Sequence, residues 1–151
     1  MKFPVNTNDL GEWMPHRAPA VWVDQVNSVT AEEGECRVYL RPDANYSGPD
    51  GFVRDSSFAE WIAQSYGFIS AVQVLSGVVP TIKKPETTFL AQIQDFVPPA
   101  ESLRIADDGK DWVDVRVRRT HQLGPIALIT GEVISSSGKS LAKARLKVFA
   151  Q

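Results

Sequence analysis

One carboxylate in this sequence is placed for acid–base chemistry. Glu60 lies inside an apolar helical pattern at residues 55–77, and a carboxyl group beside a substrate can give or take a proton. Gln64 follows one helical turn later on the same face, where its amide could orient the carboxylate. Two structural alternatives stay open. Ser57 and Glu60 have the spacing of a capping box, and Gln64 could be a satisfied amide of the core.

Two histidines are the other side chains that titrate near neutral pH. His16 lies in a rigid, proline-flanked connection at residues 15–19, where a structural anchor is favoured over catalysis. His121 falls at the end of a predicted strand, and we expect it to be solvated. No set of His, Cys or carboxylate residues has the spacing of metal ligands, so we expect no metal.

The elements that must position these residues follow from hydrophobic periodicity. Asp55 and Ser57 suit a helix N-cap and Gly77 suits the residue after a helix, so residues 55–77 are predicted to form the one long helix. A short helical turn is expected at residues 8–14. Alternating apolar and polar residues predict strands. These are 21–30, 35–41, 87–97, 102–107, 112–122, 126–135 and 140–149.

Tight turns join several of the predicted strands, which favours an antiparallel sheet. Gly109 and Gly138 supply the positive φ that such turns need. A helix that is apolar over most of its surface must lie across the dry face of that sheet. The sequence therefore predicts an α+β fold.

Length and composition bound the possible functions. The 151 residues, 43% of them hydrophobic, predict a single domain over residues 1–151. A net charge of −2 gives no general affinity for nucleic acid. The lone cysteine, Cys36, is interpreted as a buried thiol. No apolar run is long enough to span a membrane, and the amino terminus does not resemble a signal peptide, so a cytoplasmic protein is expected.

Two motifs resemble those of the bacterial 3-hydroxyacyl-(acyl-carrier-protein) dehydratases. The segment at residues 14–26 reads Met-Pro-His-Arg-Ala-Pro-Ala-Val-Trp-Val-Asp-Gln-Val. It is similar to the opening of that family, which is Leu-Pro-His-Arg, an aromatic residue, Pro and an apolar run ending Val-Asp-Arg-Val. The segment at residues 60–67 reads Glu-Trp-Ile-Ala-Gln-Ser-Tyr-Gly and is similar to Glu-Ala-Met-Ala-Gln-Ala-x-Gly.

The resemblance implies a hot-dog fold, in which one long central helix is wrapped by an antiparallel sheet of five to seven strands. It also implies a dimer whose sheets join, with the acyl tunnel at the subunit interface. The family's His-Phe-Pro-Gly stretch, which carries the catalytic histidine, is absent, and ungapped counting from Glu60 puts Tyr46 at that place. This loss resembles the divergent dehydratase-like proteins of aryl polyene and related polyketide gene clusters.

The implied function is 3-hydroxyacyl-(acyl-carrier-protein) dehydration in fatty-acid or aryl polyene/polyketide synthesis. Glu60 would carry the proton transfers, with His16 and Tyr46 as further candidates. The backbone amides of Asp55, Ser56 and Ser57 would hold the thioester oxygen, and Gln64 would contact the substrate.

An acyl carrier protein is the implied partner. Its phosphopantetheine arm brings the substrate, so no other cofactor is expected. Arg54, Lys83 and Lys84 form the expected patch for this acidic partner. The subunit partner is a second copy or another dehydratase, and neither nucleic acid nor membrane is expected. Two alternatives stay open: a non-catalytic partner of an active dehydratase, and a hot-dog acyl thioesterase in which Glu60 activates water.

Overall fold

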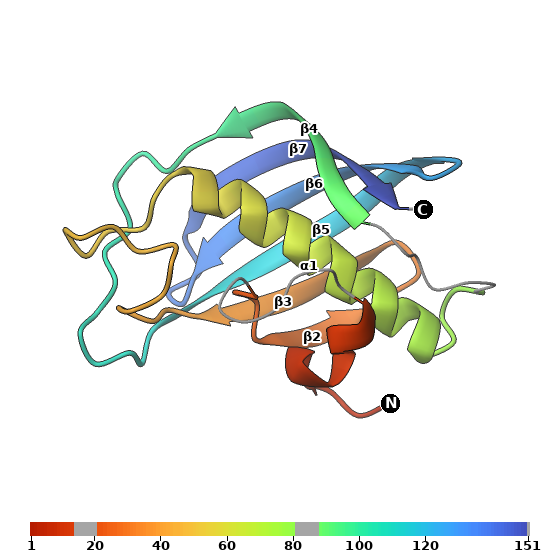
Figure 1. The fold of residues 1–151 in the computed structure, drawn as a ribbon, viewed down its shortest axis with the longest axis horizontal. Coiled ribbons are helices and arrows are strands. Elements are labelled where there is room, and N and C mark those ends of the chain that lie inside the picture. The colour runs from red at the N-terminus through yellow and green to blue at the C-terminus, as the bar shows by residue number, and fades with distance from the viewer. Residues whose placement is uncertain (14–20, 81–87, 151) are drawn as a thin grey trace.

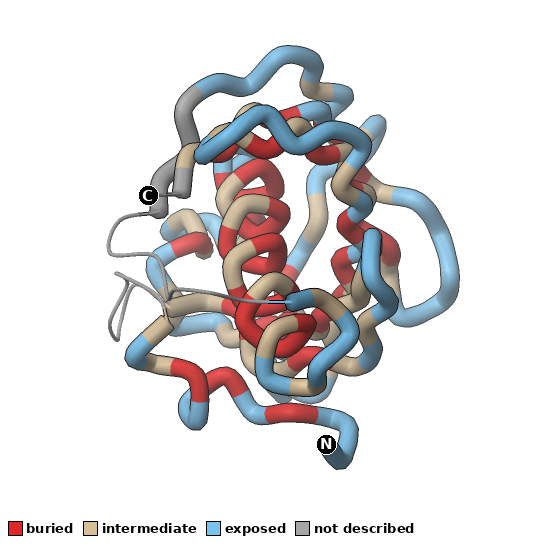
Figure 2. The backbone as a smooth tube through the Cα atoms, turned by 90° about the vertical axis from the view of Figure 1, so that its right-hand side faces the viewer, coloured by how far each residue is buried: buried red, intermediate tan, exposed pale blue. Residues whose placement is uncertain are grey.

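The long helix α1 occupies the centre of the fold in the computed structural model, which describes residues 1–13, 21–80 and 88–150. α1 spans Ser56–Leu75, one to two residues inside the predicted bounds. Gly77 follows it with φ 78°, as a residue that ends a helix in the left-handed region does. Most of its side chains are buried, and the less buried ones form one narrow stripe along the helix. Figure 2 shows the turns of α1 enclosed by the rest of the chain.

Seven antiparallel strands of the described chain form one sheet, in the order β1-β2-β3-β5-β6-β7-β4. The strands are β1 (Val5–Asn6), β2 (Gln25–Val29), β3 (Glu33–Tyr39), β4 (Thr88–Val97), β5 (Trp112–Leu123), β6 (Ile126–Ser135) and β7 (Ser140–Ala150). The short helix η1 (Thr7–Trp13) forms where a helical turn was predicted at residues 8–14. Residue 14 lies outside the described residues. α1 crosses one face of the sheet (Figure 1). The predicted α+β hot-dog architecture is confirmed.

Alternation along the strands decides which face α1 covers. Val113, Val115 and Val117 of β5 are buried, whereas Arg116 and Arg118 between and after them are exposed. The same pattern recurs in β7, where buried apolar residues alternate with exposed basic ones. The sheet therefore has one dry face toward α1 and one wet face away from it, as the period of two predicts.

Two glycines let α1 approach the sheet closely. A Cβ atom on Gly131 of β6 would lie 2.3 Å from Cγ2 of Ile62, and one on Gly34 of β3 would lie 2.8 Å from Cγ1 of Ile69. Both isoleucines belong to α1 and are buried. Their side chains fill the space that any larger residue in the strands would need, so the helix packs directly over the two strand backbones.

The predicted strand at residues 102–107 is wrong. Arg104 makes only an isolated bridge, with Phe52. The neighbouring backbone groups pair with the loop before α1: Val53 N–H donates to the carbonyl of Leu103 at 2.9 Å, and Ile105 N–H donates to that of Gly51. The segment alternates like a strand because it pairs with that loop, not with the sheet.

Other strand bounds also differ from the prediction. The first long strand begins at Gln25, not at residue 21, and its partner begins at Glu33, so the hairpin turn is shorter than expected. β1 was not predicted, because a two-residue strand leaves no periodic signal. Gly109 and Gly138 have positive φ as predicted, but Gly109 precedes β5 without a strand before it and so is not in a hairpin.

Candidate active site

Glu60 and Gln64 lie one turn apart near the start of α1, and a hydrogen bond joins them. Gln64 Nε2 donates to Glu60 Oε1 at 3.2 Å. Gln64 Oε1 accepts the backbone N–H of Trp22 at 2.9 Å. Gln64 is buried and Glu60 is half-buried. Gln64 is thus a satisfied core amide and also a group that orients the carboxylate, so both roles considered for Gln64 are compatible.

The first turn of α1 differs from the prediction in two respects. Asp55 occupies the N-cap position, but its side chain makes no capping hydrogen bond. Ser57 and Phe58 already donate their N–H groups, to the carbonyls of Arg54 at 2.9 Å and Asp55 at 3.2 Å. The capping box that was left open as an alternative reading of Glu60 is therefore not formed, because the Ser57 N–H has another acceptor.

Two amides of that turn keep the predicted character. The N–H groups of Asp55 and Ser56 have no hydrogen-bond acceptor among the described residues. Both residues are exposed, and both lie at the positive end of the helix dipole. Of the expected donors for a thioester oxygen, Asp55 and Ser56 are the ones that this arrangement leaves available, and Ser56 is the one inside α1.

Tyr46 is part of the core. Its hydroxyl donates to the carbonyl of Tyr39 at 3.1 Å and accepts the N–H of Arg41 at 2.8 Å. Its ring meets those of Trp22 and Trp61 edge to face, with centroids 5.5 and 5.1 Å apart. Burial raises the pKa of the Tyr46 hydroxyl. The hydroxyl proton is therefore committed to the backbone, which favours a structural role.

Trp61 extends this aromatic cluster inside α1. It is fully buried, and its ring lies 5.1 Å from that of Phe58. Within the described part of the chain its indole Nε1 has no hydrogen-bond partner, and neither has that of Trp22. Sequence reasoning missed this cluster, although a signal was present: Trp61 stands where the dehydratase motif has alanine. The large ring fills core space beside Phe58 and Tyr46 that an alanine would not fill.

Asp24 was also missed, although it lies in the opening motif. Its carboxylate accepts the backbone N–H of Tyr39 at 2.7 Å and pairs with Nη1 of Arg41 at 3.0 Å. Burial raises the pKa of Asp24, and the two donors partly offset that effect. The side chain ties the opening motif to the end of β3, next to Tyr46.

Three predicted site residues lie outside the described residues: His16, Lys83 and Lys84. Arg54 is exposed beside the start of α1, where its Nη1 donates to the carbonyl of Asn45 at 3.4 Å. His121 is exposed on β5, as predicted, two residues before that strand ends at Leu123. β5 ends on the side of the fold away from the start of α1 (Figure 1). Among the described residues, no histidine lies beside Glu60.

The described residues contain neither a candidate metal site nor a helix suited to crossing a membrane. Within residues 1–13, 21–80 and 88–150, no group of three or more His, Cys, Asp or Glu side chains is arranged to hold a metal ion. In the described chain no helix combines the length and apolar character that crossing a bilayer requires.

Comparison with known proteins gives both a family and a set of similar folds. The family model ApeP-like, described as ApeP dehydratase, matches residues 8–151. No curated protein sequence matches the chain. The dehydratase heterocomplex ApeI:P from Xenorhabdus doucetiae has a TM-score of 0.80 at 18% identity, covering 100% of this chain and 93% of that chain.

Two further solved structures are similar at lower TM-scores. The TT0310 protein from Thermus thermophilus has a TM-score of 0.61 at 15% identity, covering 90% of this chain and 100% of that one. A hypothetical thioesterase with coenzyme A from Streptococcus pneumoniae has a TM-score of 0.57 at 11% identity, covering 83% of this chain and 84% of that one. At such identities the likeness shows the fold alone.

The family match, in contrast, extends over nearly the whole sequence. It includes both segments on which the resemblance to dehydratases rested, residues 14–26 and 60–67. The resemblance, including its divergent branch, is confirmed. The chain belongs to the ApeP-like dehydratase family.

Proposed function

We propose that this chain is one subunit of a dehydratase complex that removes water from 3-hydroxyacyl groups held on an acyl carrier protein, in fatty-acid or aryl polyene synthesis. The observation that carries the proposal is the hydrogen bond from Gln64 to Glu60, which holds a half-buried carboxylate in one orientation at the start of α1. The family membership supports the same reaction class.

Dehydration needs an acid, a base and a donor for the thioester oxygen. Glu60 gives its proton to the departing hydroxyl, which leaves as water. A base takes the α-proton, and the electron pair of that C–H bond forms the new double bond. The Ser56 N–H, at the positive end of α1, holds the thioester oxygen while negative charge develops on it.

The base comes from outside the described part of this chain. His121 is exposed near the end of β5, and that strand end lies away from the start of α1 (Figure 1). Tyr46 has its hydroxyl committed to the backbone. The candidates that remain are His16 and a histidine of the partner subunit, because imidazole titrates near neutral pH.

The partner subunit would bind at the free edge of the sheet. β4 ends the strand order and has β7 as its one strand neighbour among the described residues. Ile93 and Val97 on β4 are 46% and 60% exposed. An uncovered edge with apolar side chains readily pairs with a strand of another chain. That the similar ApeI:P structure is a heterocomplex favours another dehydratase over a second copy as this partner.

The acyl carrier protein would dock beside the start of α1. Arg54 is exposed there. Lys83 and Lys84, the other residues of the proposed basic patch, lie outside the described residues. An acidic carrier would be attracted to these side chains and would present its acyl group on the phosphopantetheine arm. The chain then needs no cofactor of its own.

A second candidate is a non-catalytic partner subunit. It is favoured by the position of Tyr46, which stands at the place of the family's catalytic histidine and is packed between Trp22 and Trp61. In this case the chain would shape the acyl tunnel of an active dehydratase without supplying a reacting group.

Reconstitution distinguishes the candidates. We would mix a 3-hydroxyacyl carrier protein with this chain, with the partner dehydratase, and with both, and follow the loss of water by mass spectrometry. The proposal expects Glu60→Gln to abolish the turnover that this chain adds, while Glu101→Gln, an exposed control, leaves it unchanged.

Three other outcomes would reject the proposal. Turnover by the complex that survives Glu60→Gln would support the non-catalytic candidate. Full turnover by the partner alone would leave this chain without a role in the reaction. Release of the free acid would identify a thioesterase in which Glu60 activates water.

A further inference from the structure

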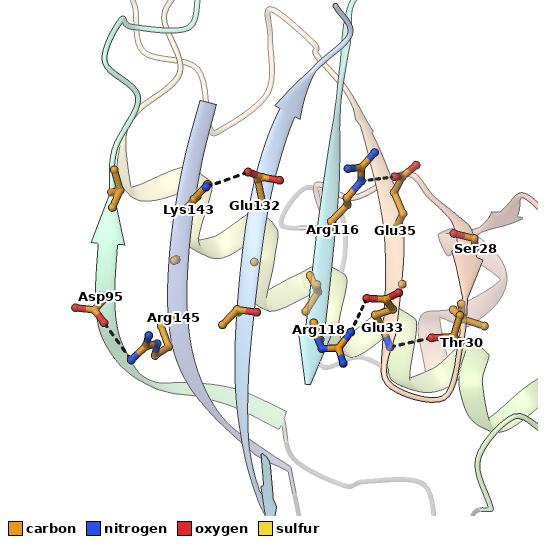
Figure 3. A pocket seen from close by; sticks show the side chains of 17 residues that line it. Ser28, Thr30, Glu33, Glu35, Asp95, Arg116, Arg118, Glu132, Lys143 and Arg145 are labelled. Atoms are coloured by element: carbon orange, nitrogen blue, oxygen red, sulfur yellow. Dashed lines mark hydrogen bonds and ion pairs between the residues drawn. The ribbon is translucent and has the colours of Figure 1, made fainter. Parts of the chain in front are cut away.

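A row of charged side chains crosses the wet face of the sheet, one residue from each of four neighbouring strands. It consists of Glu35 on β3, Arg116 on β5, Glu132 on β6 and Lys143 on β7, which are Cα partners from strand to strand. Arg116 Nε pairs with Glu35 at 3.0 Å, and Lys143 Nζ pairs with Glu132 at 3.6 Å. The sign alternates along this charge row, as Figure 3 shows.

The charge row lies in a groove of about 760 Å³ on the face opposite α1. The side chains of Arg116 and Lys143 are 63% and 65% exposed. Their partners Glu35 and Glu132 are 24% and 30% exposed, so the basic groups are largely in contact with water and the acidic ones are partly covered. A partner on this face would meet an ordered pattern of charges and a hollow wide enough for long side chains.

The order of charges gives the row a specific symmetry. Read from β3 to β7 the signs are negative, positive, negative, positive. Read in reverse they are positive, negative, positive, negative. A second row laid over the first in reverse therefore places Glu35 opposite Lys143, and Arg116 opposite Glu132, so that every acid meets a base.

A second row on the same face obeys the same rule. Glu33, Arg118, Thr130 and Arg145 are Cα partners on the same four strands. Reversal places Glu33 opposite Arg145, and Arg118 opposite Thr130. No two like charges meet in either row. Both rows thus avoid like-charge contacts under the same reversal of strand order. This agreement favours the reversed arrangement of two stacked faces over other arrangements.

We propose that this face binds the same face of a second copy of the chain, across a two-fold axis that runs along the strands between β5 and β6. A two-fold axis makes a closed, self-complementary contact. Stacked sheets lie about 10 Å apart and cross at about 30°. Because Arg116 and Glu132 are the residues of the row nearest the axis, this crossing angle displaces them least from their counterparts in the other copy. The groove gives their long side chains room to interdigitate.

This contact is separate from the subunit pairing proposed at the edge of β4, and it does not depend on Glu60. If another dehydratase occupies the β4 edge of each chain, the face contact joins two such heterodimers into one tetramer. Because its attraction comes from exposed charges, the face contact weakens in salt, since the Debye length falls from about 10 Å at 0.1 M to about 3 Å at 1 M.

Charge exchange within the row tests the proposal without changing the net charge. The double variant Glu132→Lys, Lys143→Glu keeps an ion pair between β6 and β7. Its signs become negative, positive, positive, negative, which read the same in both directions. Like charges then meet across the two-fold axis. The double variant Glu35→Arg, Arg116→Glu gives the opposite symmetric pattern.

Sedimentation velocity at low and high salt would measure association of the wild type, of each double variant and of their mixture. We expect the wild type to associate at low salt, and each double variant to bind itself about a hundredfold more weakly, as facing like charges require. Mixing the two variants places opposite charges face to face again and restores the wild-type species. Circular dichroism melting of each variant establishes that it is folded.

Three results would overturn the proposal. The first is wild type that does not exceed the size of the double variants at low salt. The second is a folded double variant that associates like wild type. The third is a mixture of the two variants that stays as weak as either alone. The same measurements in complex with the partner dehydratase would show whether the contact joins two heterodimers.

Discussion

Gln64 points its amide group at Glu60 because the other end of that amide is fixed. Its Oε1 accepts the N–H of Trp22, which leaves Nε2 facing the carboxylate at 3.2 Å. A side-chain amide whose oxygen and nitrogen are both hydrogen-bonded cannot flip by about 180° without losing both hydrogen bonds. The opening motif and the helix motif, far apart in sequence, are thus joined through one buried side chain.

The substitution Gln64→Glu should make stability depend on pH. The introduced carboxyl keeps an acceptor oxygen for Trp22 N–H, but it sets a second carboxylate against Glu60. Two carboxylates at one site raise the pKa of the introduced group above its unfolded value. The folded state then binds the proton more tightly, so stability is highest in acid and falls as pH rises through the raised pKa. Urea unfolding at about pH 4 and about pH 7.5 would measure this.

The control is Gln64→Leu, which is uncharged. It leaves the buried N–H of Trp22 without its acceptor and costs about 1–3 kcal/mol of stability. That loss should be the same at both pH values. If Gln64→Glu lowered the free energy of unfolding by the same amount at both pH values, the contact between Gln64 and Glu60 would not be as close as described.

Local signals were enough to predict most of the elements. Alternation located β5, β6 and β7, and cap residues located α1 between Asp55 and Gly77. The segment at residues 102–107 shows the limit of such signals. It alternates like a strand, but which backbone it pairs with depends on Val53 and the loop before α1. Periodicity carries no information about that choice.

The site was predictable where a motif carried it and not where packing decided it. Glu60 and Gln64 came from the helix motif, but the acceptor role of Gln64 needs Trp22, 42 residues away. Tyr46 was found by ungapped counting, which gives the position in the sequence but not the direction of the side chain. The charge row depends on strand register across β3, β5, β6 and β7, which follows from the folded sheet alone.

Tyr46→Phe should weaken the fold and spare the reaction. The change removes the hydroxyl that bonds the carbonyl of Tyr39 and the N–H of Arg41, and leaves the ring against Trp22 and Trp61. We expect a loss of about 1–2 kcal/mol in the free energy of unfolding. Turnover of the reconstituted complex, per folded chain, should stay at the wild-type value. A large fall in turnover without loss of stability would instead make Tyr46 a reacting group.

Gly131→Ala should destabilise the packing of α1 on the sheet. The new Cβ would lie 2.3 Å from Cγ2 of Ile62, an atom next to the branch point that cannot move away without shifting the helix. Overpacking of this kind costs about 1–3 kcal/mol. Thermal or urea unfolding would measure the loss.

A double-mutant cycle identifies the cause. Ile62→Ala removes the atoms that clash, so Gly131→Ala should cost much less in that background than in the wild type. Equal costs in the two backgrounds would contradict the close approach of Ile62 to the β6 backbone.

Cys36 should react slowly while the protein is folded. The thiol is buried under α1, with Sγ 3.8 Å from the carbonyl of Ser65, and burial raises its pKa to about 12. The thiolate is the reactive form of cysteine. In urea the thiol regains its ordinary pKa of 9.0. Iodoacetamide at about pH 8 should therefore modify the chain far faster in urea than in buffer. Comparable rates in the two conditions would show an accessible thiol.

The same shift makes the stabilising effect of Cys36 depend on pH. The folded pKa of about 12 exceeds the ordinary value of 9.0, so the folded state holds the proton more tightly than the unfolded chain does. The contribution is complete below pH 9 and is lost as pH rises toward 12. By linkage, wild type should lose about 2 kcal/mol more than Cys36→Ala between about pH 8 and about pH 10.5. Urea titrations of both proteins at the two pH values would measure it, and parallel losses would show that the thiol ionises as it does in water.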